Sequence, residues 1–221
     1  MRKNPLISAL TLTVLAVPAL AHEGDIAVGN FGGVLMTGLG DDVAGTSDFP
    51  WRVFGAELID QGGVVFTDEP GLLGPFGDGF APGTGIGFNV LKAVRSWNGT
   101  DFNNISSVGM NISLGSFSVD APATDIFTPG FDIVSDASVD FDEHGFFTLS
   151  TNQTGIYLLE MEITADGFDA SDAIWVVFNY GLDEEDHEVA IEWVEENLVP
   201  APGALGVLAA AGLLGVRRRR N

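Results

Sequence analysis

Three aspartates in one predicted loop are the first candidates for chemistry. Asp166, Asp169 and Asp172, with Gly167 among them, lie between two runs of residues that we predict to be strands. Oxygen ligands spaced along a turn suit calcium, although this spacing does not match the EF-hand loop. We therefore predict either a calcium site or, as is commoner for such a pattern, an acidic hairpin loop in solvent.

A second acidic turn, residues 140–144, contains three carboxylates and His144. It is either a metal site or a solvated connection before a strand that we predict at residues 146–149. The sequence has no catalytic-triad order, zinc-protease motif, phosphate-binding loop or cysteine-based zinc pattern. With 31 acidic residues, a pair of carboxylates is no sign of a glycosidase. We therefore expect no catalysis.

The elements that position these residues are predicted to be strands. Residues 86–90, 108–114 and 157–163 alternate apolar with polar or small side chains, and residues 173–180 are apolar on both faces, as in a central strand. After Gly115 the apolar phase slips by one residue, which predicts a bulge or bend. Roughly ten strands predict a mainly β fold, a β-sandwich or jelly-roll-like domain.

One short helix near the C-terminus interrupts the β pattern. Asp183 is a suitable N-cap for Glu184–Asn197, and acidic residues in the first turn favour the helix dipole. We predict that the helix packs on the sandwich through a narrow apolar face. That predicted face consists of Val189, Ala190, Trp193, Val194 and Asn197.

The N-terminus has the pattern of a secretory signal peptide. Arg2 and Lys3 precede an apolar run at residues 5–17, and small residues at positions 18–21 predict cleavage after Ala21. The domains are then a signal peptide at 1–21, an acidic β domain at 22–198 and a terminal segment at 199–221.

Cleavage after Ala21 makes His22 the mature N-terminus, which offers an amine and an imidazole together. In this respect the chain resembles the lytic polysaccharide monooxygenases, in which an N-terminal histidine and a second histidine chelate copper on a β-sandwich. The resemblance implies His144 or His187 as the second ligand. The alternative is an exposed polar residue after the cleavage site.

The C-terminus combines a proline motif, an apolar stretch and a basic end. Val199, Pro200, Ala201 and Pro202 lead into residues 203–216, and the arginines Arg217, Arg218, Arg219 and Arg220 follow. Fourteen helical residues reach roughly 21 Å, which is short of a hydrocarbon core of about 30 Å. The arginines should remain cytoplasmic, so the body lies outside, held transiently or permanently by a C-terminal membrane helix.

This terminal segment resembles the PEP-CTERM sorting signals of Gram-negative bacteria. Its form, with Ala201 where glutamate is usual, is similar to a variant in planctomycete proteins, and residues 66–71, 83–94 and 156–196 resemble uncharacterised planctomycete proteins. The resemblance implies an exosortase-type sorting enzyme as partner. No activity is known for such proteins, so the resemblance predicts no activity for the β domain.

Composition sets further limits on the body. All 31 acidic residues but only Arg52, Lys92 and Arg95 of the basic ones lie outside the two terminal segments, which gives a net charge of −28. Such a surface repels nucleic acid and suits high salt or divalent cations. The chain has no cysteine, so core burial or a metal must stabilise it.

We therefore expect an exported, non-enzymatic structural or interaction protein of the cell surface or extracellular matrix, without a cofactor unless calcium binds. The alternatives are a secreted polysaccharide- or calcium-binding module and a copper-dependent or hydrolytic enzyme. Trp51, Trp97 and Phe102 either line a polysaccharide-binding face or, as is commoner, belong to the core.

Overall fold

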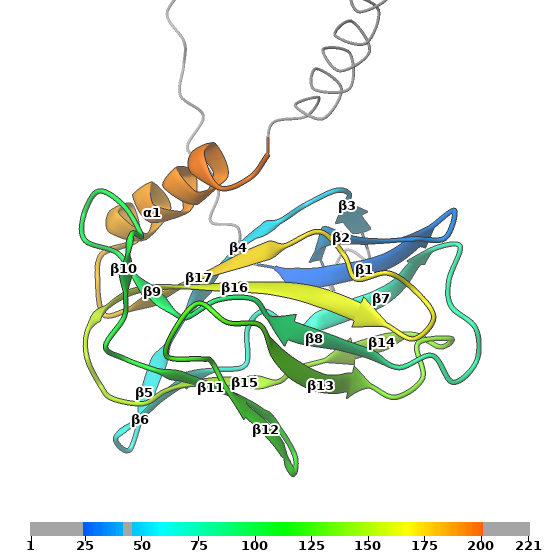
Figure 1. Cartoon of the computed structure of the whole chain (residues 1–221), viewed down its shortest axis with the longest axis horizontal. Coiled ribbons are helices and arrows are strands. Elements are labelled where there is room, and N and C mark those ends of the chain that lie inside the picture. Colours follow the sequence, from blue (N-terminus) through cyan, green and yellow to red (C-terminus); the bar gives the residue numbers. More distant parts are fainter. Residues whose placement is uncertain (1–23, 42–45, 201–221) are drawn as a thin grey trace, which may run out of the picture.

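The computed structural model of the chain describes residues 24–41 and 46–200. The described part is mainly β with one short helix and resembles a β-sandwich, which confirms the coarse prediction (Figure 1). The predicted signal peptide, His22 and the terminal residues from Ala201 onward lie outside the described residues. The described strands number seventeen rather than roughly ten, because the pairing includes several strands of two or three residues.

Sheet A has the first of the described strands, β1, at its centre. β1 pairs antiparallel with β2 and parallel with β7, so the start of β1 lies beside the start of β7. Its order is β14 (Phe141–Glu143), β7 (Leu72–Gly77), β1 (Asp25–Phe31), β2 (Val34–Asp41) and β3 (Thr46–Asp48).

Sheet B contains the longest of the described strands, β16, and the predicted central strand, β17. β17 lies between β16, with which it is antiparallel, and β4, with which it is parallel, and six of its seven residues are buried. Its main order is β10 (Asn104–Ile105), β9 (Arg95–Ser96), β16 (Gly155–Ala165), β17 (Ile174–Tyr180) and β4 (Val53–Glu57); β8 (Ile86–Val90) also pairs with β16, and β13 (Thr128–Val134) pairs with β8.

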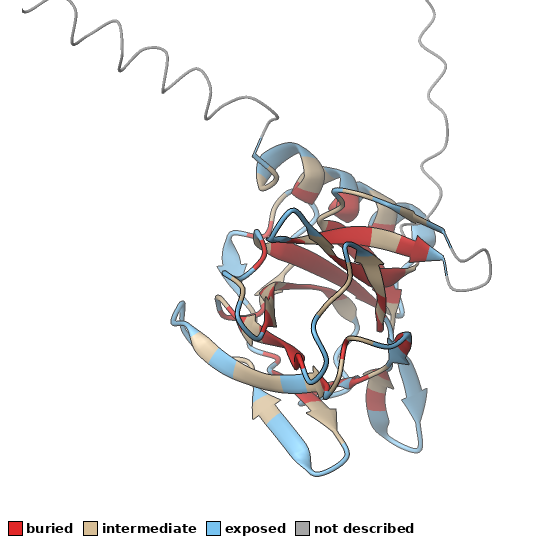
Figure 2. Cartoon of the chain, turned by 90° about the vertical axis from the view of Figure 1, so that its right-hand side faces the viewer, coloured by how far each residue is buried: buried red, intermediate tan, exposed pale blue. Residues whose placement is uncertain are grey.

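Sheet C contains two hairpins, β5–β6 and β11–β12, whose turns project from the body (Figure 1). Its order is β12 (Phe117–Asp120), β11 (Met110–Leu114), β15 (Phe146–Leu149), β6 (Val64–Thr67) and β5 (Ile59–Gln61). Buried residues concentrate on the faces that the sheets turn toward one another, whereas the hairpin tips are exposed (Figure 2).

The main core lies between the three sheets. It joins Ile26 of sheet A and Phe178 of sheet B to Phe147 of sheet C, and the rings of Phe147 and Phe178 are 5.1 Å apart. The opposite face of sheet B packs against α1 (Glu184–Asn197), where Val177 contacts the helix cluster that includes Ile191. Alternate residues of β17 therefore enter two separate cores, which is why residues 174–178 are all apolar.

The predicted bulge or bend after Gly115 is a hairpin turn and not a bulge. Leu114 and Phe117 pair across the turn between β11 and β12, and Gly115 has a φ of +58°. Residues that pair across a hairpin project from the same face, so a two-residue turn shifts the alternation by one position. A glycine suits this turn because it adopts positive φ without steric cost.

The predicted bounds of α1 are confirmed, but two of its details are wrong. Asp183 has the extended backbone of an N-cap, yet its side chain makes no capping hydrogen bond. The buried face is turned from the predicted one: His187, Ala190, Ile191 and Val194 are buried, while Val189 is 47% exposed. His187 can be buried because both nitrogens of its ring have polar partners beneath the helix, the Val177 carbonyl and Glu57.

Candidate functional site

Asp25 stands at the start of β1 and is the buried carboxylate of the site. Only 7% of the residue is exposed, and its Oδ1 accepts a hydrogen bond of 2.8 Å from the backbone N–H of Gly71. The N–H of Ile26 donates to the carbonyl of Gly71 at 2.9 Å. These two bonds fix the start of β1 against the segment that leads into β7.

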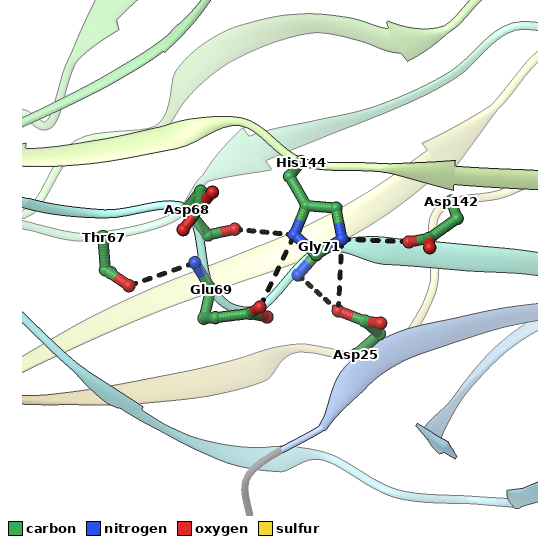
Figure 3. Close-up of polar contacts among 7 residues, drawn as sticks. All are labelled: Asp25, Thr67, Asp68, Glu69, Gly71, Asp142 and His144. Carbon is green, nitrogen blue, oxygen red and sulfur yellow. Dashed lines mark hydrogen bonds and ion pairs between the residues drawn. The ribbon is translucent and has the colours of Figure 1, made fainter. Parts of the chain in front are cut away.

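His144 follows β14 and points at the same place (Figure 3). Its Nδ1 lies 3.0 Å from the backbone carbonyl oxygen of Asp68, and its Nε2 lies 2.9 Å from Oδ1 of Asp142. A carbonyl oxygen only accepts, so Nδ1 carries a hydrogen and donates it. The ring orientation therefore leaves Nε2 directed at carboxylates.

Two further carboxylates surround this imidazole. Oδ1 of Asp25 is 4.0 Å from Nε2, and Oε1 of Glu69 is 3.8 Å from Nδ1. Three segments that are distant in sequence thus place Asp25, Glu69, Asp142 and His144 together, and we call these four residues the His144 cluster.

The cluster alters the proton affinities of its members. Burial raises the pKa of Asp25, although the Gly71 N–H and His144 act against that rise. Burial and then the nearby Asp25 carboxylate raise the pKa of Glu69. Burial disfavours the charged form of His144, but the Asp68 carbonyl together with Asp25, Glu69 and Asp142 outweighs it and raises its pKa.

Gly71 packs closely against both the imidazole and the buried carboxylate. A Cβ atom at this position would lie 2.7 Å from Nε2 of His144 and 2.8 Å from Oδ1 of Asp25. Both distances are shorter than a van der Waals contact. A side chain at position 71 would therefore force the His144 ring or the Asp25 carboxylate to move.

The cluster forms one wall of a cavity of about 710 Å³ between sheet A and β4. Three members of the cluster, Asp25, Glu69 and His144, line it. Three more carboxylates line it as well: Asp41, Asp48 and Glu57. Five carboxylates facing one cavity attract cations and repel anions.

A second group of polar residues lies under α1. His187 is 1% exposed; its Nε2 is 2.9 Å from the Val177 carbonyl oxygen and its Nδ1 is 3.1 Å from Oε1 of Glu57. Glu57 also accepts a hydrogen bond of 2.9 Å from the Asn179 side chain. Glu57, Glu184 and His187 form the second of two groups in the described residues whose donor atoms are close enough to share a metal ion.

The three aspartates predicted to bind calcium lie in the loop between β16 and β17. Asp166 accepts a hydrogen bond of 3.2 Å from the Gly85 N–H, and Asp172 lies 3.6 Å from the Arg52 guanidinium. Neither they nor Asp169 belong to either possible metal group in the described part of the chain. Calcium binding at this loop stays a prediction.

The acidic turn at residues 140–144 contributes Asp142 and His144 to the cluster. Sequence reasoning missed Asp25 and Glu69, because nothing in a linear pattern pairs the start of β1 with residues 68–71. His144 and His187 lie in separate groups. The predicted copper partner His22 lies outside the described residues.

The other predicted residues have structural contacts. Phe102 is buried, and Trp97 packs on Phe102 and Trp193 beside α1, with ring centroids 5.0 and 6.0 Å away. The Trp51 indole N–H donates to the Val53 carbonyl at 2.6 Å. Of the sorting motif, Val199 and Pro200 are described, and both line a shallow pocket of about 380 Å³ beside Arg52.

No protein-family model matches the chain, and no curated protein matches it. In the two described stretches, no helix is both long and apolar enough to cross a membrane. A functional interpretation therefore rests on the residues and their geometry.

Proposed function

We propose that the chain is an exported, non-catalytic protein of the cell surface or extracellular matrix, and that its body holds a cation in the cavity beside the His144 cluster. The observation that carries the binding proposal is the cavity wall with its five carboxylates. The body adds a long-range field of the same sign through its net charge of −28.

Export is supported by the two terminal patterns. A cleavable signal at 1–21 and a sorting segment at 199–221 both place the jelly-roll-like body outside the cell. The sorting segment follows α1 directly, and an exosortase-type enzyme with membrane contact through residues 203–216 is the proposed route to the surface. Such a location exposes the cavity to extracellular cations.

Partial neutralisation is the physical reason for a bound cation. Asp25 is nearly buried, and burial disfavours its charged form. A cation in the cavity offsets this cost and also reduces the repulsion among the surrounding carboxylates. The binding energy is therefore concentrated at the wall that contains Asp25, Glu69 and His144.

Isothermal titration calorimetry of the full chain, purified in detergent, tests this proposal. Calcium, zinc and spermidine are titrated separately, first into the unchanged protein and then into the Asp48→Asn variant. Asp48 lines the cavity, whereas Glu196, on the exposed face of α1, supplies a control of equal charge change in Glu196→Gln.

We expect at least one cation to bind, with an affinity that Asp48→Asn lowers several-fold and Glu196→Gln leaves unchanged. Absence of binding by every cation would contradict the proposal. An equal loss in both variants would also contradict it, since that result indicates a diffuse surface effect.

A further inference from the structure

We propose that Asp25, Asp142 and His144 bind one divalent transition-metal ion of the zinc class at the wall of the cavity. The inference rests on the proposed function, because it names the cation and its ligands. The three donor atoms lie within 4.8 Å of one another. They come from three different positions in sheet A, the start of β1, the middle of β14 and the residue after β14.

The spacing of the donors suits a small ion. Nitrogen and oxygen ligands lie about 2.0–2.2 Å from zinc, so tetrahedral ligand atoms are roughly 3.3 Å apart. Nε2 of His144 is 2.9 Å from Oδ1 of Asp142 and 4.0 Å from Oδ1 of Asp25. Movements of less than about 1 Å would bring both distances to the tetrahedral value.

The imidazole is held as a metal ligand requires. Nδ1 donates to the Asp68 carbonyl at 3.0 Å, which fixes the ring and leaves Nε2 for the ion (Figure 3). Histidine ligands of metals usually donate their second ring N–H to a carbonyl or carboxylate in this way. Oδ1 of Asp25 is oriented independently by the N–H of Gly71.

Gly71 provides an observation that is separate from the charges. Its φ is not among the positive values, so its backbone conformation does not require glycine. The restriction is the space beside Nε2 and Asp25, which a Cβ atom would enter at 2.7 and 2.8 Å. A glycine here lets Nε2 of His144 and Oδ1 of Asp25 both lie against the backbone, which keeps these two donor atoms at their present spacing.

The ligand chemistry selects the class of ion. Calcium takes six to eight oxygen ligands, whereas imidazole nitrogen suits zinc, copper, iron and nickel. Asp142 and Asp25 complete a set of one nitrogen and two oxygens. Asp25 and His144 also line the cavity, from which water or an extracellular ligand would supply the fourth ligand. Zinc is the probe because it accepts tetrahedral sites of this composition without redox chemistry.

The group under α1 is the weaker candidate. The His187 ring is 1% exposed, and its Glu57 partner already accepts a hydrogen bond from Asn179. Gly55 lies beside this ring, but a Cβ there would be 3.7 Å from Nε2 of His187, an ordinary van der Waals distance. The exposed member of this group, Glu184, therefore supplies a matched control, since Glu184→Gln removes one carboxylate from a possible metal group without touching the His144 cluster.

The test uses the full chain in detergent, stripped of metal with a chelator and titrated with zinc by calorimetry. The variants are Asp142→Asn, His144→Gln, Gly71→Ala and Glu184→Gln, each checked for an unchanged far-ultraviolet dichroism spectrum. The Asp142 side chain is 47% exposed, so its substitution is the least disruptive to folding. Cobalt absorption in the visible range reports tetrahedral coordination separately from affinity.

We expect one zinc ion per chain, an affinity at least tenfold lower in Asp142→Asn and His144→Gln, and a smaller loss in Gly71→Ala. Glu184→Gln should bind as the unchanged protein does. Zinc binding that Asp142→Asn leaves intact would overturn the assignment, as would binding lost only in Glu184→Gln. Binding of calcium or spermidine without zinc overturns this inference but keeps the proposed function, whereas the absence of all cation binding overturns both.

Discussion

Replacing Trp175 with alanine tests the packing of α1 on sheet B. Trp175 is 5% exposed and belongs to the apolar cluster that includes Val53 and Ile191. The guanidinium of Arg52 lies 5.0 Å from the centre of its ring. Loss of the Trp175 side chain should lower the free energy of unfolding by about 3–5 kcal/mol, because apolar surface is no longer buried and a cavity remains.

One feature of the indole reduces this cost. Its buried Nε1 has no hydrogen-bond partner among the described residues. An unsatisfied buried donor costs about 1–3 kcal/mol, and the alanine variant removes that cost together with the ring. We therefore expect a net destabilisation of about 3 kcal/mol for Trp175→Ala. Trp175→Phe keeps one aromatic ring and removes the N–H together with part of the indole, so its change should lie within about 1 kcal/mol.

Thermal and chemical denaturation of the full chain measure these changes. For a domain of this size, 1 kcal/mol corresponds to about 2–4 °C, so Trp175→Ala should melt roughly 6–12 °C lower. Phe117→Ala is the control, since Phe117 is 61% exposed and its replacement should change stability little. A loss below about 1 kcal/mol in Trp175→Ala would refute the packing argument, as would an equal loss in both alanine variants.

Three other predictions concern charge. Without metal, the protein should lose stability as the pH rises above 6.5, because the raised pKa of His144 means that the folded state binds this proton more tightly than the unfolded chain does. A plot of melting temperature against pH should show this loss, and His144→Gln should flatten the plot. Salt should stabilise the body, and sodium and calcium at equal ionic strength should act alike; a calcium excess lost in Asp169→Asn would instead reveal the loop site. Neutral replacements of Arg217–Arg220 should disturb surface retention in cell fractionation, and unchanged display would contradict the sorting proposal.

The regular elements were the most predictable part of the fold. Alternation identified the strand at Ile86–Val90, and uniform apolarity identified the central position of β17, because burial on one or two faces leaves a direct mark on the sequence. The charged first turn and apolar spacing likewise identified the bounds of α1. Its buried face was mistaken, since His187 is polar and enters the interior only because Glu57 and the Val177 carbonyl meet its ring.

The candidate site was predictable only in part. The acidic turn that contains Asp142 and His144 is visible in the sequence, but its connection to Asp25 depends on the parallel pairing of β1 with β7. Pairings between distant segments leave no local pattern in the sequence, so the close contact of Gly71 with His144 and Asp25 could not be predicted either. The aspartates in the loop around residue 169 are the more obvious candidates in the sequence, yet in the structure they have separate partners. Asp166 accepts a hydrogen bond from Gly85, and Asp172 lies near Arg52.

Anomalous scattering from a crystal of the protein grown with zinc would test the central claim most directly. Data collected on both sides of the zinc absorption edge locate the ion without reference to binding models. We predict one peak within about 2.0–2.2 Å of His144 Nε2 and of one oxygen each from Asp25 and Asp142. A map without a peak at this wall of the cavity, with the His144 ring still bonded to Asp142, would contradict the account.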